Sequence, residues 1–290
     1  MPSDLQGDDA RRDRLAKALR PDEDGLPRLM GILNATPDSF HADSRVSGDV
    51  AVERGLAMFE SGATWVDVGG ESTRPGAEPV SLEEEQARVL PVIQRLKAAR
   101  PEGLVSIDTR HAIVAKAALE AGADMVNDVS GLRDPAMMDV VLGAGAAVCI
   151  MHMQGVPETM QDNVHYDEVV SEVHSTLWST ATALTDRGHP AALISLDPGI
   201  GFGKSQHHNL ALLERGEALS EKGRWAVLWG VSRKSVVGHL TGQSKTEDRL
   251  AGTLGLAAVA CLRGVGVLRV HDVVPHWDLL QAMRPFDLRG

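Results

Sequence analysis

The sequence predicts an α/β fold, a single (β/α)8 TIM barrel with a short polar N-terminal extension. Eight short apolar runs between Leu29 and Val270 have the length of strands, and helical stretches separate most of them. The length of 290 residues also fits, because such barrels commonly use about 250 residues as one domain. These barrels carry their chemistry at the carboxyl ends of the strands. Polar residues that follow the apolar runs are therefore candidates for one shared site.

Each predicted strand is followed by polar residues at the point where it stops. The first four strands and their polar ends are Leu29–Leu33 before Asn34, Trp65–Val68 before Glu71–Arg74, Val105–Ile107 before Asp108, and Met125–Val126 before Asn127. The second four are Ala146–Met151 before His152, Leu193–Leu196 before Asp197, Val227–Trp229 before Ser232–Ser235, and Val265–Val270, which encloses Arg269, before His271. Since Arg269 and His271 are two residues apart, both can point to the same side of the last strand.

Local start and stop signals predict several of the intervening helices. Residues 81–97 begin with the capping-box pattern Ser-Leu-Glu-Glu and continue with apolar periodicity. Residues 167–187 form an apolar stripe, and Gly188 is placed to end that helix; the stripe consists of Val169, Val173, Leu177, Ala181 and Leu184. A second capping-box pattern at residues 244–247 predicts a helix that runs towards Arg263.

The charge and the cysteine content of the chain limit the kinds of molecule it is expected to bind and the compartment in which it is expected to work. The net charge of −11 argues against nucleic acid or an anionic membrane, so an anionic substrate needs a local cluster of basic side chains. Residues 1–28 mix acids and bases without an apolar signal segment, and we expect a mobile or loosely helical extension before a barrel domain of residues 29–290. Cys149 and Cys261 lie far apart in apolar patterns, which predicts buried free thiols and a cytoplasmic protein.

Familiar motifs are nearly matched and are rejected. The stretch Gly199–Ser205 resembles a phosphate loop, but Pro198 stands where that loop needs Gly. In the same stretch Lys204 replaces the last Gly of a dinucleotide fingerprint. The turn Gly230–Lys234 lacks the second Gly of a nucleophile elbow, which disfavours Ser232 as an acyl-transfer serine. The sequence has neither HExxH nor CxxC, so a dedicated zinc site is not expected.

Eight ordered segments at the strand ends are far more specific. In the first half they are Met30-Gly-Ile-Leu-Asn-Ala-Thr-Pro-Asp-Ser-Phe40, Asp67-Val-Gly-Gly-Glu-Ser-Thr-Arg-Pro-Gly76, Ser106-Ile-Asp-Thr-Arg110 and Asn127-Asp-Val-Ser-Gly131. In the second half they are Met151-His-Met-Gln-Gly155, Asp197-Pro-Gly-Ile-Gly-Phe-Gly-Lys204, Gly230-Val-Ser-Arg-Lys-Ser235 and Arg269-Val-His-Asp-Val273. Together they resemble the dihydropteroate synthases, pterin-binding TIM-barrel enzymes of folate biosynthesis that sulfonamides inhibit.

The resemblance implies a transferase. In that family 7,8-dihydropterin-6-ylmethyl diphosphate loses pyrophosphate, and its exocyclic carbon joins the amine of 4-aminobenzoate to give 7,8-dihydropteroate. A flat pterin ring has a fixed edge of donors and acceptors, so its burial requires matched polar partners. Departure of pyrophosphate requires positive charge near the leaving oxygens. The resemblance also implies sulfonamide competition with 4-aminobenzoate, and a homodimer packed through late helices, for which Leu250–Leu262 is our candidate surface.

The resemblance assigns residues of this chain to each part of the site. The expected catalytic residues are Asp108, Lys234, Arg269 and His271, and the expected pterin contacts are Asp108, Asn127, Asp197 and Lys234. The diphosphate is expected on Asn34, Arg74, Arg269 and His271. For 4-aminobenzoate the expected contacts are Thr73, Arg74, Pro75, Phe202, Lys234 and Ser235. Purely structural roles are alternatives for some of these residues, because Asp197 and Asp108 can cap helices and Arg269 can form a surface ion pair.

Magnesium is the expected cofactor. The resemblance places Mg²⁺ on the diphosphate and on Asn34, and one protein oxygen with phosphates and waters is a normal shell for this ion. The first loop departs from the family, because His41-Ala42-Asp43 stands where Ser-Asp-Gly usually follows the Phe. The loop carboxylate is thus displaced to Asp43, which we expect as a second candidate metal contact.

Two alternatives stay open at this stage. A pterin-dependent methyltransferase that serves a corrinoid shares the barrel and the pterin contacts, but does not need the Glu-Ser-Thr-Arg-Pro-Gly segment of residues 71–76 or the pair of Arg269 and His271. A paralogue that binds pterin without turnover is favoured by the altered first loop. Product formation from the two substrates separates both alternatives from the synthase.

Overall fold

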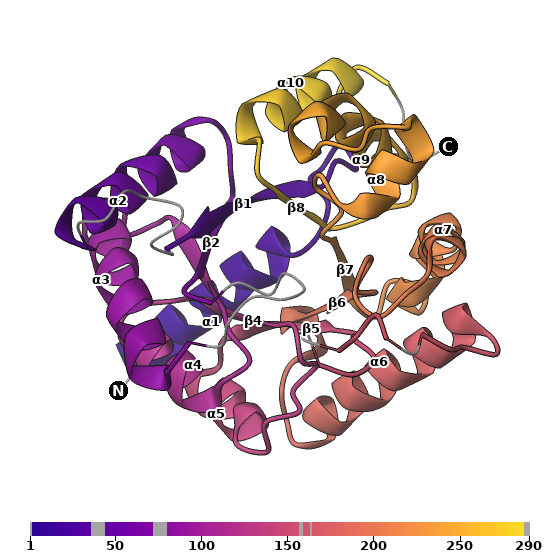
Figure 1. Cartoon of the computed structure of the whole chain (residues 1–290). Coiled ribbons are helices and arrows are strands. Elements are labelled where there is room, and N and C mark those ends of the chain that lie inside the picture. The colour runs from indigo at the N-terminus through magenta and orange to yellow at the C-terminus, as the bar shows by residue number, and fades with distance from the viewer. Residues whose placement is uncertain (1, 36–43, 72–79, 157–158, 163, 287–290) are drawn as a thin grey trace.

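The computed structural model is a closed barrel of eight parallel strands in the order β1 to β8, wrapped by helices (Figure 1). It describes residues 2–35, 44–71, 80–156, 159–162 and 164–286. The predicted (β/α)8 barrel is confirmed, and all eight predicted strands form at their expected places. Among the described residues, no helix has both the length and the apolar character needed to cross a membrane.

The strands alternate with helices along the whole chain. The first half contains α1 (Pro2–Ala18), β1 (Arg28–Asn34), α2 (Ser44–Glu60), β2 (Trp65–Gly69), α3 (Leu82–Ala99), β3 (Leu104–Asp108), α4 (Ala112–Glu120), β4 (Met125–Asp128), α5 (Met137–Ala144) and β5 (Ala147–Met151). The second half contains α6 (Val169–Asp186), η2 (Ala191–Leu193), β6 (Ile194–Asp197), α7 (Gln206–Glu214), η3 (Gly216–Ser220), β7 (Ala226–Trp229), α8 (Ser235–Thr241), η4 (Thr246–Arg249), α9 (Leu250–Leu262), β8 (Val267–Val270) and α10 (Val273–Met283).

The strands are buried on both faces, as a parallel barrel requires. In β2 and β5 every residue is buried, and the apolar runs are nearly continuous because helices cover the outer face. Outward side chains such as Val66 and Ile107 pack against the helices, whereas Trp65, Met125 and Leu228 belong to a separate cluster inside the barrel. The parallel register carries the polar strand ends to one rim.

The local signals for two helices are confirmed. Ser81 caps α3, and its hydroxyl accepts the backbone N–H of Glu84 at 3.2 Å. This contact satisfies a donor that the first turn of a helix cannot pair internally. The predicted apolar stripe of α6 is buried throughout, and Gly188 follows the helix with φ of +96°. A left-handed conformation of this kind favours glycine.

The second capping-box pattern does not form a cap, although the predicted helix towards Arg263 is present as α9. Residues 246–249 form the short 3₁₀ helix η4, and α9 begins only at Leu250, without a side-chain cap. The physical reason lies in Arg249. Its guanidinium donates to the carbonyl oxygens of Gln243 at 3.1 Å, Ser244 at 2.6 Å and Arg233 at 3.0 Å. These bonds hold residues 243–249 as a turn against the end of β7, where a continuous helix would not place the carbonyl groups.

Of the two alternatives expected for residues 1–28, a mobile or a loosely helical extension, the structure has a helix, α1, and the end of this helix is packed into the barrel. Leu15, Ala18 and Leu19 are buried with Trp65 in the cluster inside the barrel, and the Trp65 indole donates to the carbonyl of Ala18 at 2.9 Å. Figure 1 shows α1 in indigo across the middle of the barrel. Charged residues dominate this helix, so the short apolar spacing of i, i+3 and i+4 formed by Leu15, Ala18 and Leu19 does not stand out in the sequence. The helix closes the amino-terminal end of the barrel, away from the polar rim.

Shortening these buried leucines will destabilise the barrel. We expect Leu15→Ala and Leu19→Ala each to lower the free energy of unfolding by about 2–5 kcal/mol, because each leaves a cavity among side chains that cannot fully close it. Both leucines are 0% exposed. Urea denaturation followed by circular dichroism measures the change. Asp13→Ala, at an exposed position of the same helix, is the control, and unchanged stability in both leucine variants would show that α1 does not seal the barrel.

Candidate active site at the carboxyl rim of the barrel

A buried ion cluster joins three strands in the upper barrel. The Arg269 guanidinium of β8 donates from Nε to Asp67 Oδ2 at 2.6 Å and from an Nη atom to Asp108 Oδ2 at 2.5 Å. Asn127 of β4 donates its amide to the same Asp67 oxygen at 3.0 Å. The Asp67 side chain is fully buried. One guanidinium therefore holds carboxylates of β2 and β3 in place, and Asp67 in turn orients the amide of Asn127.

Asp67 is the site residue that sequence reasoning missed. It lies within the apolar run Trp65–Val68 and not after it, so a search for polar strand ends passed over it. A signal was present, because a carboxylate in the middle of a buried strand is rare unless a charged partner is close. The structure supplies that partner in Arg269.

Burial sets the protonation of this cluster. It raises the pKa of Asp108 to about 7, and the adjacent Arg269 opposes that rise. Burial alone would lower the pKa of Arg269, but Asp67 and Asp108 together raise it above its ordinary value. The guanidinium thus stays charged at any pH at which the protein works. Asp108 is poised to change its charge near neutral pH.

Lys234 and Asp197 face each other below the rim. Lys234 Nζ donates to the carbonyl of Ile200 at 2.7 Å and lies 4.4 Å from the centre of the Phe202 ring. Burial lowers the pKa of Lys234 to about 8, and Asp197 opposes the fall. A side chain at Gly230 would reach within 3.5 Å of Asp197 Oδ2 and 3.7 Å of Lys234 Nζ. The glycine therefore leaves open the space that both charged groups border.

The helix-capping role considered for Asp197 is not found, because α7 begins only at Gln206 and Ser205 is its N-cap. Asp197 Oδ1 accepts the backbone N–H of Gly199 at 2.7 Å, which fixes the carboxylate and leaves Oδ2 directed at the space beside Gly230. The capping role considered for Asp108 is not found, because His111 is the N-cap of α4 and makes no side-chain cap bond. Asp108 instead pairs with Arg269.

Lys204 is a second residue that sequence reasoning did not assign. It is 3% exposed, and its ammonium donates to the carbonyl oxygens of His152 at 3.2 Å and Phe202 at 3.0 Å. Nζ also lies 3.0 Å from His152 Nδ1. Gly199, with φ of +66°, passes so close to the His152 carbonyl that a Cβ would approach it to 1.8 Å. These contacts shape the loop that presents Phe202 to Lys234.

The remaining predicted residues are placed at the mouth or lie outside the described residues. Asn34 ends β1 with a half-buried side chain, and His271 follows β8 with an exposed one. Ser235 is exposed at the start of α8. The residues Asp43, Thr73, Arg74 and Pro75 lie outside the described residues. The structure thus brings together Asp108, Asn127, Asp197, Lys234, Phe202 and Arg269, and does not test the two loops.

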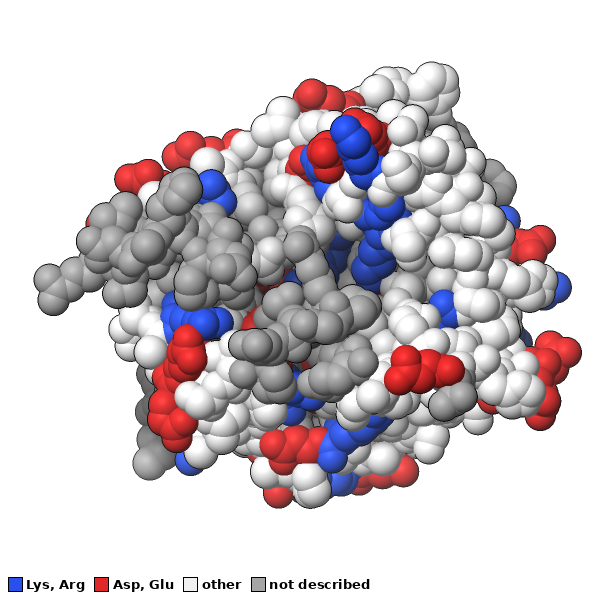
Figure 2. Space-filling model, viewed as in Figure 1, with Lys and Arg blue, Asp and Glu red and all other residues white. Residues whose placement is uncertain are grey.

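The charge of this rim is local and differs from that of the whole chain. Figure 2 shows Lys and Arg side chains gathered in the hollow at the middle of this face, with Asp and Glu spread around its edge. This is the local basic cluster that a chain of net charge −11 needs in order to bind an anion.

Protein side chains alone do not form a metal cage in the described part of the chain. No group of three His, Cys, Asp or Glu side chains there could hold a metal ion. The amide oxygen of Asn34 at the mouth is a hard ligand, and a Mg²⁺ ion that takes its other ligands from phosphates and waters suits such a sparse donor set. The residues present therefore fit a metal ion that arrives with a diphosphate.

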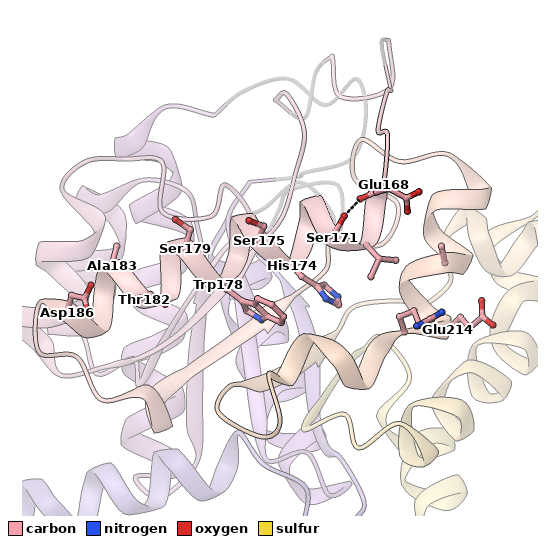
Figure 3. Close-up of a pocket in the computed structure, with 13 residues that line it drawn as sticks. Glu168, Ser171, His174, Ser175, Trp178, Ser179, Thr182, Ala183, Asp186 and Glu214 are labelled. Atoms are coloured by element: carbon pink, nitrogen blue, oxygen red, sulfur yellow. Dashed lines mark hydrogen bonds between the residues drawn. The ribbon is translucent and has the colours of Figure 1, made fainter.

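A large groove lies elsewhere on the molecule. It has a volume of about 1070 Å³ and lies on the outer wall between α6 and α7 (Figure 3). His174, Trp178 and hydroxyl side chains of α6 line it, and none of the predicted site residues does. The groove is therefore separate from the chemistry of the rim.

Comparisons with known proteins agree with this geometry. The sequence profile of the family described as pterin binding enzyme matches residues 30–271. The dihydropteroate synthase of Escherichia coli strain K12 is 41% identical over 261 residues, which cover 89% of this chain and 90% of that protein.

Solved structures give the same result. The dihydropteroate synthase of Xanthomonas albilineans, solved with 4-aminobenzoic acid and separately with 7,8-dihydropteroate, gives TM-scores of 0.83 and 0.80 at 44% and 41% identity, with 90% of this chain and 93% of that chain covered. The Yersinia pestis enzyme in a sulfonamide drug complex gives a TM-score of 0.82 at 36% identity, with the same coverage. The chain belongs to the pterin-binding enzyme family and, within it, to the dihydropteroate synthases.

Proposed function

We propose that this protein is a dihydropteroate synthase that joins 7,8-dihydropterin-6-ylmethyl diphosphate to 4-aminobenzoate. The products are 7,8-dihydropteroate and pyrophosphate. The observation that carries this function is the assembly, at one rim, of Asp108, Asn127, Asp197, Lys234 and Arg269 in a chain of this family. A corrinoid-linked methyltransferase is disfavoured, because the similar proteins are synthases at about 40% identity over most of the chain.

The pterin edge is matched by three groups of different polarity. Asp197 Oδ2 is an acceptor for ring N–H groups, Lys234 is a donor for a ring nitrogen or carbonyl, and the Asn127 amide offers both kinds of contact. Asp197 and Asn127 are buried and Lys234 is half-buried, and Asp197 and Lys234 border the same space beside Gly230. A ligand that lacked this pattern would leave buried polar groups unpaired, which costs about 1–3 kcal/mol per group. The pocket therefore selects a pterin by its hydrogen-bonding edge.

Departure of pyrophosphate separates charge across the pocket. When the C–O bond breaks, its electron pair leaves with the diphosphate and the pterin methylene becomes cationic. Asp108 lies deep in the pocket and stabilises that cation, while Arg269 keeps the carboxylate in place. The diphosphate is held at the mouth by Asn34, His271, Arg269 and the loop residue Arg74. The arylamine then attacks the methylene carbon and releases one proton.

A magnesium ion, when bound, would support departure of the leaving group. Asn34, with Asp43 as a second candidate, would hold a Mg²⁺ ion whose charge neutralises the diphosphate oxygens. The half-buried position of Asn34 at the end of β1 supports this assignment, because that end opens towards the mouth.

The site of 4-aminobenzoate adjoins the pterin pocket. Phe202 offers an apolar ring face, and Lys234 lies against that ring at 4.4 Å. Ser235 and the loop residues Thr73, Arg74 and Pro75 complete this subsite and receive the substrate carboxylate. Sulfonamides carry an aromatic amine of the same shape, so they compete for the same place.

We also propose a homodimer, which an apolar face on the late helices supports. The exposed positions of α9 are Ala251, Gly255, Val259 and Leu262, which recur at helical spacing on one side. On α10, which packs against α9, Val274 and Trp277 are also exposed. Figure 1 shows α8, α9 and α10 grouped at one side of the barrel. Small residues allow close helix approach, which favours a second copy of this chain as the partner.

Buried free Cys149 and Cys261 favour a cytoplasmic location.

The synthase reaction itself is the first test. We expect purified protein to form 7,8-dihydropteroate and to release pyrophosphate from the two substrates, and to stop when EDTA removes Mg²⁺. Sulfamethoxazole is expected to raise the apparent KM for 4-aminobenzoate without changing kcat. Tight pterin binding without product at saturating Mg²⁺ would instead identify a paralogue without turnover.

The pH dependence of kcat/KM for the pterin diphosphate is expected to show the titration of Asp108 and of Lys234. We expect a fall below about pH 7, where Asp108 takes up a proton and loses its charge, and a fall above about pH 8, where Lys234 loses its ammonium. Asp108→Asn should lower kcat about 10²–10³-fold and remove the acidic limb. Lys234→Arg should move the alkaline limb to higher pH, because a guanidinium stays protonated.

The control for the acidic limb is Glu85→Gln. Glu85 is also buried, and burial raises its pKa to about 7, so it is the other described carboxylate with this titration. It takes no part in the proposed reaction. Loss of the acidic limb in Glu85→Gln, with the limb retained in Asp108→Asn, would show that the assignment to Asp108 is wrong.

The dimer face can be tested by charge insertion. We expect Val259→Glu and Leu262→Glu to shift the protein from dimer to monomer in sedimentation velocity, because each places a carboxylate inside an apolar interface. Ile113→Glu is the matched control, since Ile113 is 57% exposed on α4 and Leu262 is 63% exposed on α9. Dimers that persist in both α9 variants would place the interface elsewhere.

A further inference from the structure

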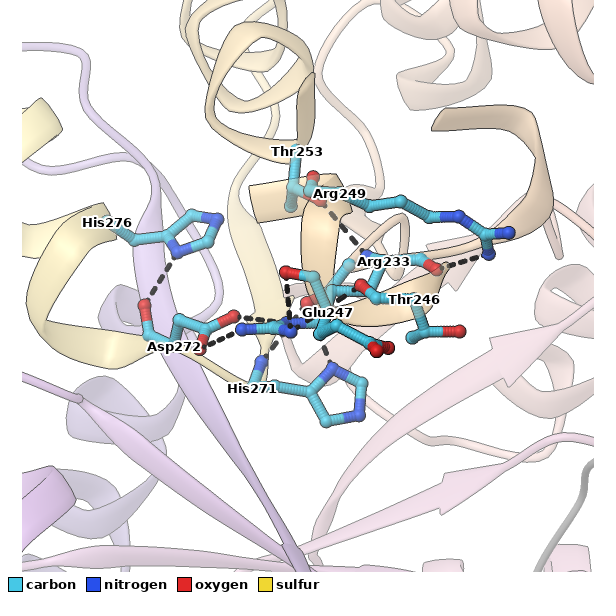
Figure 4. A network of polar contacts seen from close by, with 9 residues as sticks. Arg233, Thr246, Glu247, Arg249, Thr253, His271, Asp272 and His276 are labelled. Atoms are coloured by element: carbon cyan, nitrogen blue, oxygen red, sulfur yellow. Dashed lines mark hydrogen bonds and ion pairs between the residues drawn. The ribbon is translucent and has the colours of Figure 1, made fainter. Parts of the chain in front are cut away.

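The turn after β7 is joined to the segment after β8 by two adjacent contacts. Ser232 binds His271. Arg233 binds Asp272 (Figure 4), and the next residue of the turn is Lys234. We call Ser232, Arg233, His271 and Asp272 the clasp. The clasp contains the diphosphate-side residue His271 and directly precedes the pterin-side residue Lys234 in the chain, so its geometry relates the two halves of the site.

The Ser232 hydroxyl contacts His271 at two atoms, the backbone nitrogen and Nδ1 of the ring. The backbone N–H of His271 donates to Ser232 Oγ at 3.2 Å, and the same oxygen lies 2.9 Å from His271 Nδ1. A hydroxyl has one proton and two acceptor sites, and Oγ uses one of these sites for the backbone N–H. Among the hydrogen bonds of the described residues, Nδ1 is the acceptor within reach of the hydroxyl proton, so both groups are satisfied when Nδ1 accepts. In a neutral imidazole the proton then sits on Nε2.

The Arg233–Asp272 pair holds the turn in a conformation that it would not adopt alone. Arg233 has φ of +58°, a left-handed conformation that costs a residue with a side chain about 1–2 kcal/mol. Its Nε donates to one carboxylate oxygen of Asp272 at 2.7 Å, and an Nη atom donates to the other oxygen at 2.7 Å. The backbone N–H of Arg233 donates to Thr253 Oγ1 at 3.1 Å, and its carbonyl accepts from Arg249 at 3.0 Å. Side chain and backbone are therefore both fixed.

The left-handed residue sends neighbouring side chains in different directions. Arg233 extends to Asp272 outside the barrel, whereas Lys234 Nζ reaches inward to the carbonyl of Ile200. If the turn relaxed to an ordinary conformation, Lys234 would be re-aimed and Ser232 would move relative to His271. The ion pair thus stabilises both contacts at once.

We propose that Ser232 and Arg233 are positioning residues of the synthase reaction. Ser232 holds His271 with its proton on Nε2, where it can donate to the leaving diphosphate. The ion pair of Arg233 with Asp272 keeps Lys234 and His271 in their positions relative to each other. This inference rests on the proposed function for its kinetic consequence. The position of the imidazole proton does not depend on turnover and is measured separately.

The first experiment measures the proton on the imidazole. Nitrogen-15 NMR of the full-length protein without substrate, at pH 8, distinguishes the two neutral tautomers, and His271→Gln assigns the signal. We expect the Nε2–H form in the wild type, a mixture in Ser232→Ala, and the Nε2–H form again in Ser232→Thr. The control is Ser179→Ala, at an exposed position of α6. An Nδ1–H tautomer in the wild type, or an unchanged signal in Ser232→Ala, would overturn the role of Ser232.

The second experiment separates the two substrates kinetically. We expect Ser232→Ala to raise the KM for the pterin diphosphate about tenfold, the effect of one hydrogen bond to a charged group, and to change the KM for 4-aminobenzoate less than twofold. An equal change in both would show a merely structural role. If the wild type forms no dihydropteroate while the tautomer results hold, the proposed function fails and the assignment of the imidazole proton stands.

The third experiment tests the ion pair by exchange of its charges. Arg233→Gln and Asp272→Asn are each expected to lower kcat/KM about 10–100-fold, because one partner is left without compensation. The double variant Arg233→Asp with Asp272→Arg should recover at least tenfold of that loss. Arg95→Gln, which removes the exposed pair of Arg95 with Asp49, is the control and should not change kcat/KM. No recovery in the folded double variant, or full activity in the single variants, would refute the proposal.

Discussion

The guanidinium of Arg269 is the interaction on which the site depends. It lies between Asp67 and Asp108 inside the barrel, at 2.6 and 2.5 Å, and joins β8 to β2 and β3. Charges buried in this way are costly to desolvate, so each is tolerated only while its partners are present. Asn127 is oriented by the same Asp67 oxygen. Loss of Arg269 would leave two carboxylates without their cation, so the geometry of these residues on β2, β3 and β4 depends on one guanidinium of β8.

The fold supplies the conditions that this cluster needs. The strands are buried on both faces, and α1 closes the opposite end of the barrel with Leu15 and Leu19. Water is thereby kept from the floor beneath the charges, and electrostatic interactions above it are strengthened. The glycine at position 230 then leaves open the space between Asp197 and Lys234. A rigid, closed scaffold with one open end thus concentrates polar chemistry at that end.

Much of this could be predicted from the sequence, and the errors share a physical cause. Apolar runs that end in polar residues identify strands because parallel barrels bury both faces, and the ordered motifs identify the family. Asp67 was missed because its partner Arg269 is about 200 positions away in sequence, and only the closed barrel brings them together. The failed cap at Ser244 depends on Arg249 in the same way. The leucines of α1 are buried by Trp65, a tertiary contact that helix periodicity in a charged segment does not reveal.

The charges at the rim also explain how an acidic protein can drive heterolysis. Arg269 is already balanced by Asp67 and Asp108, and Asp197 faces Lys234, so the described interior is close to neutral. A cation that forms beside Asp108 is stabilised there, but a diphosphate would be repelled by the same carboxylates. In the proposed reaction the anion is favoured towards the mouth, where Asn34 and His271 lie and where Arg269 is also expected to contact it. In the proposed reaction the two products of bond cleavage are thus stabilised at different depths. The pocket lowers the barrier because its charge arrangement matches the separated ions better than the intact diphosphate ester.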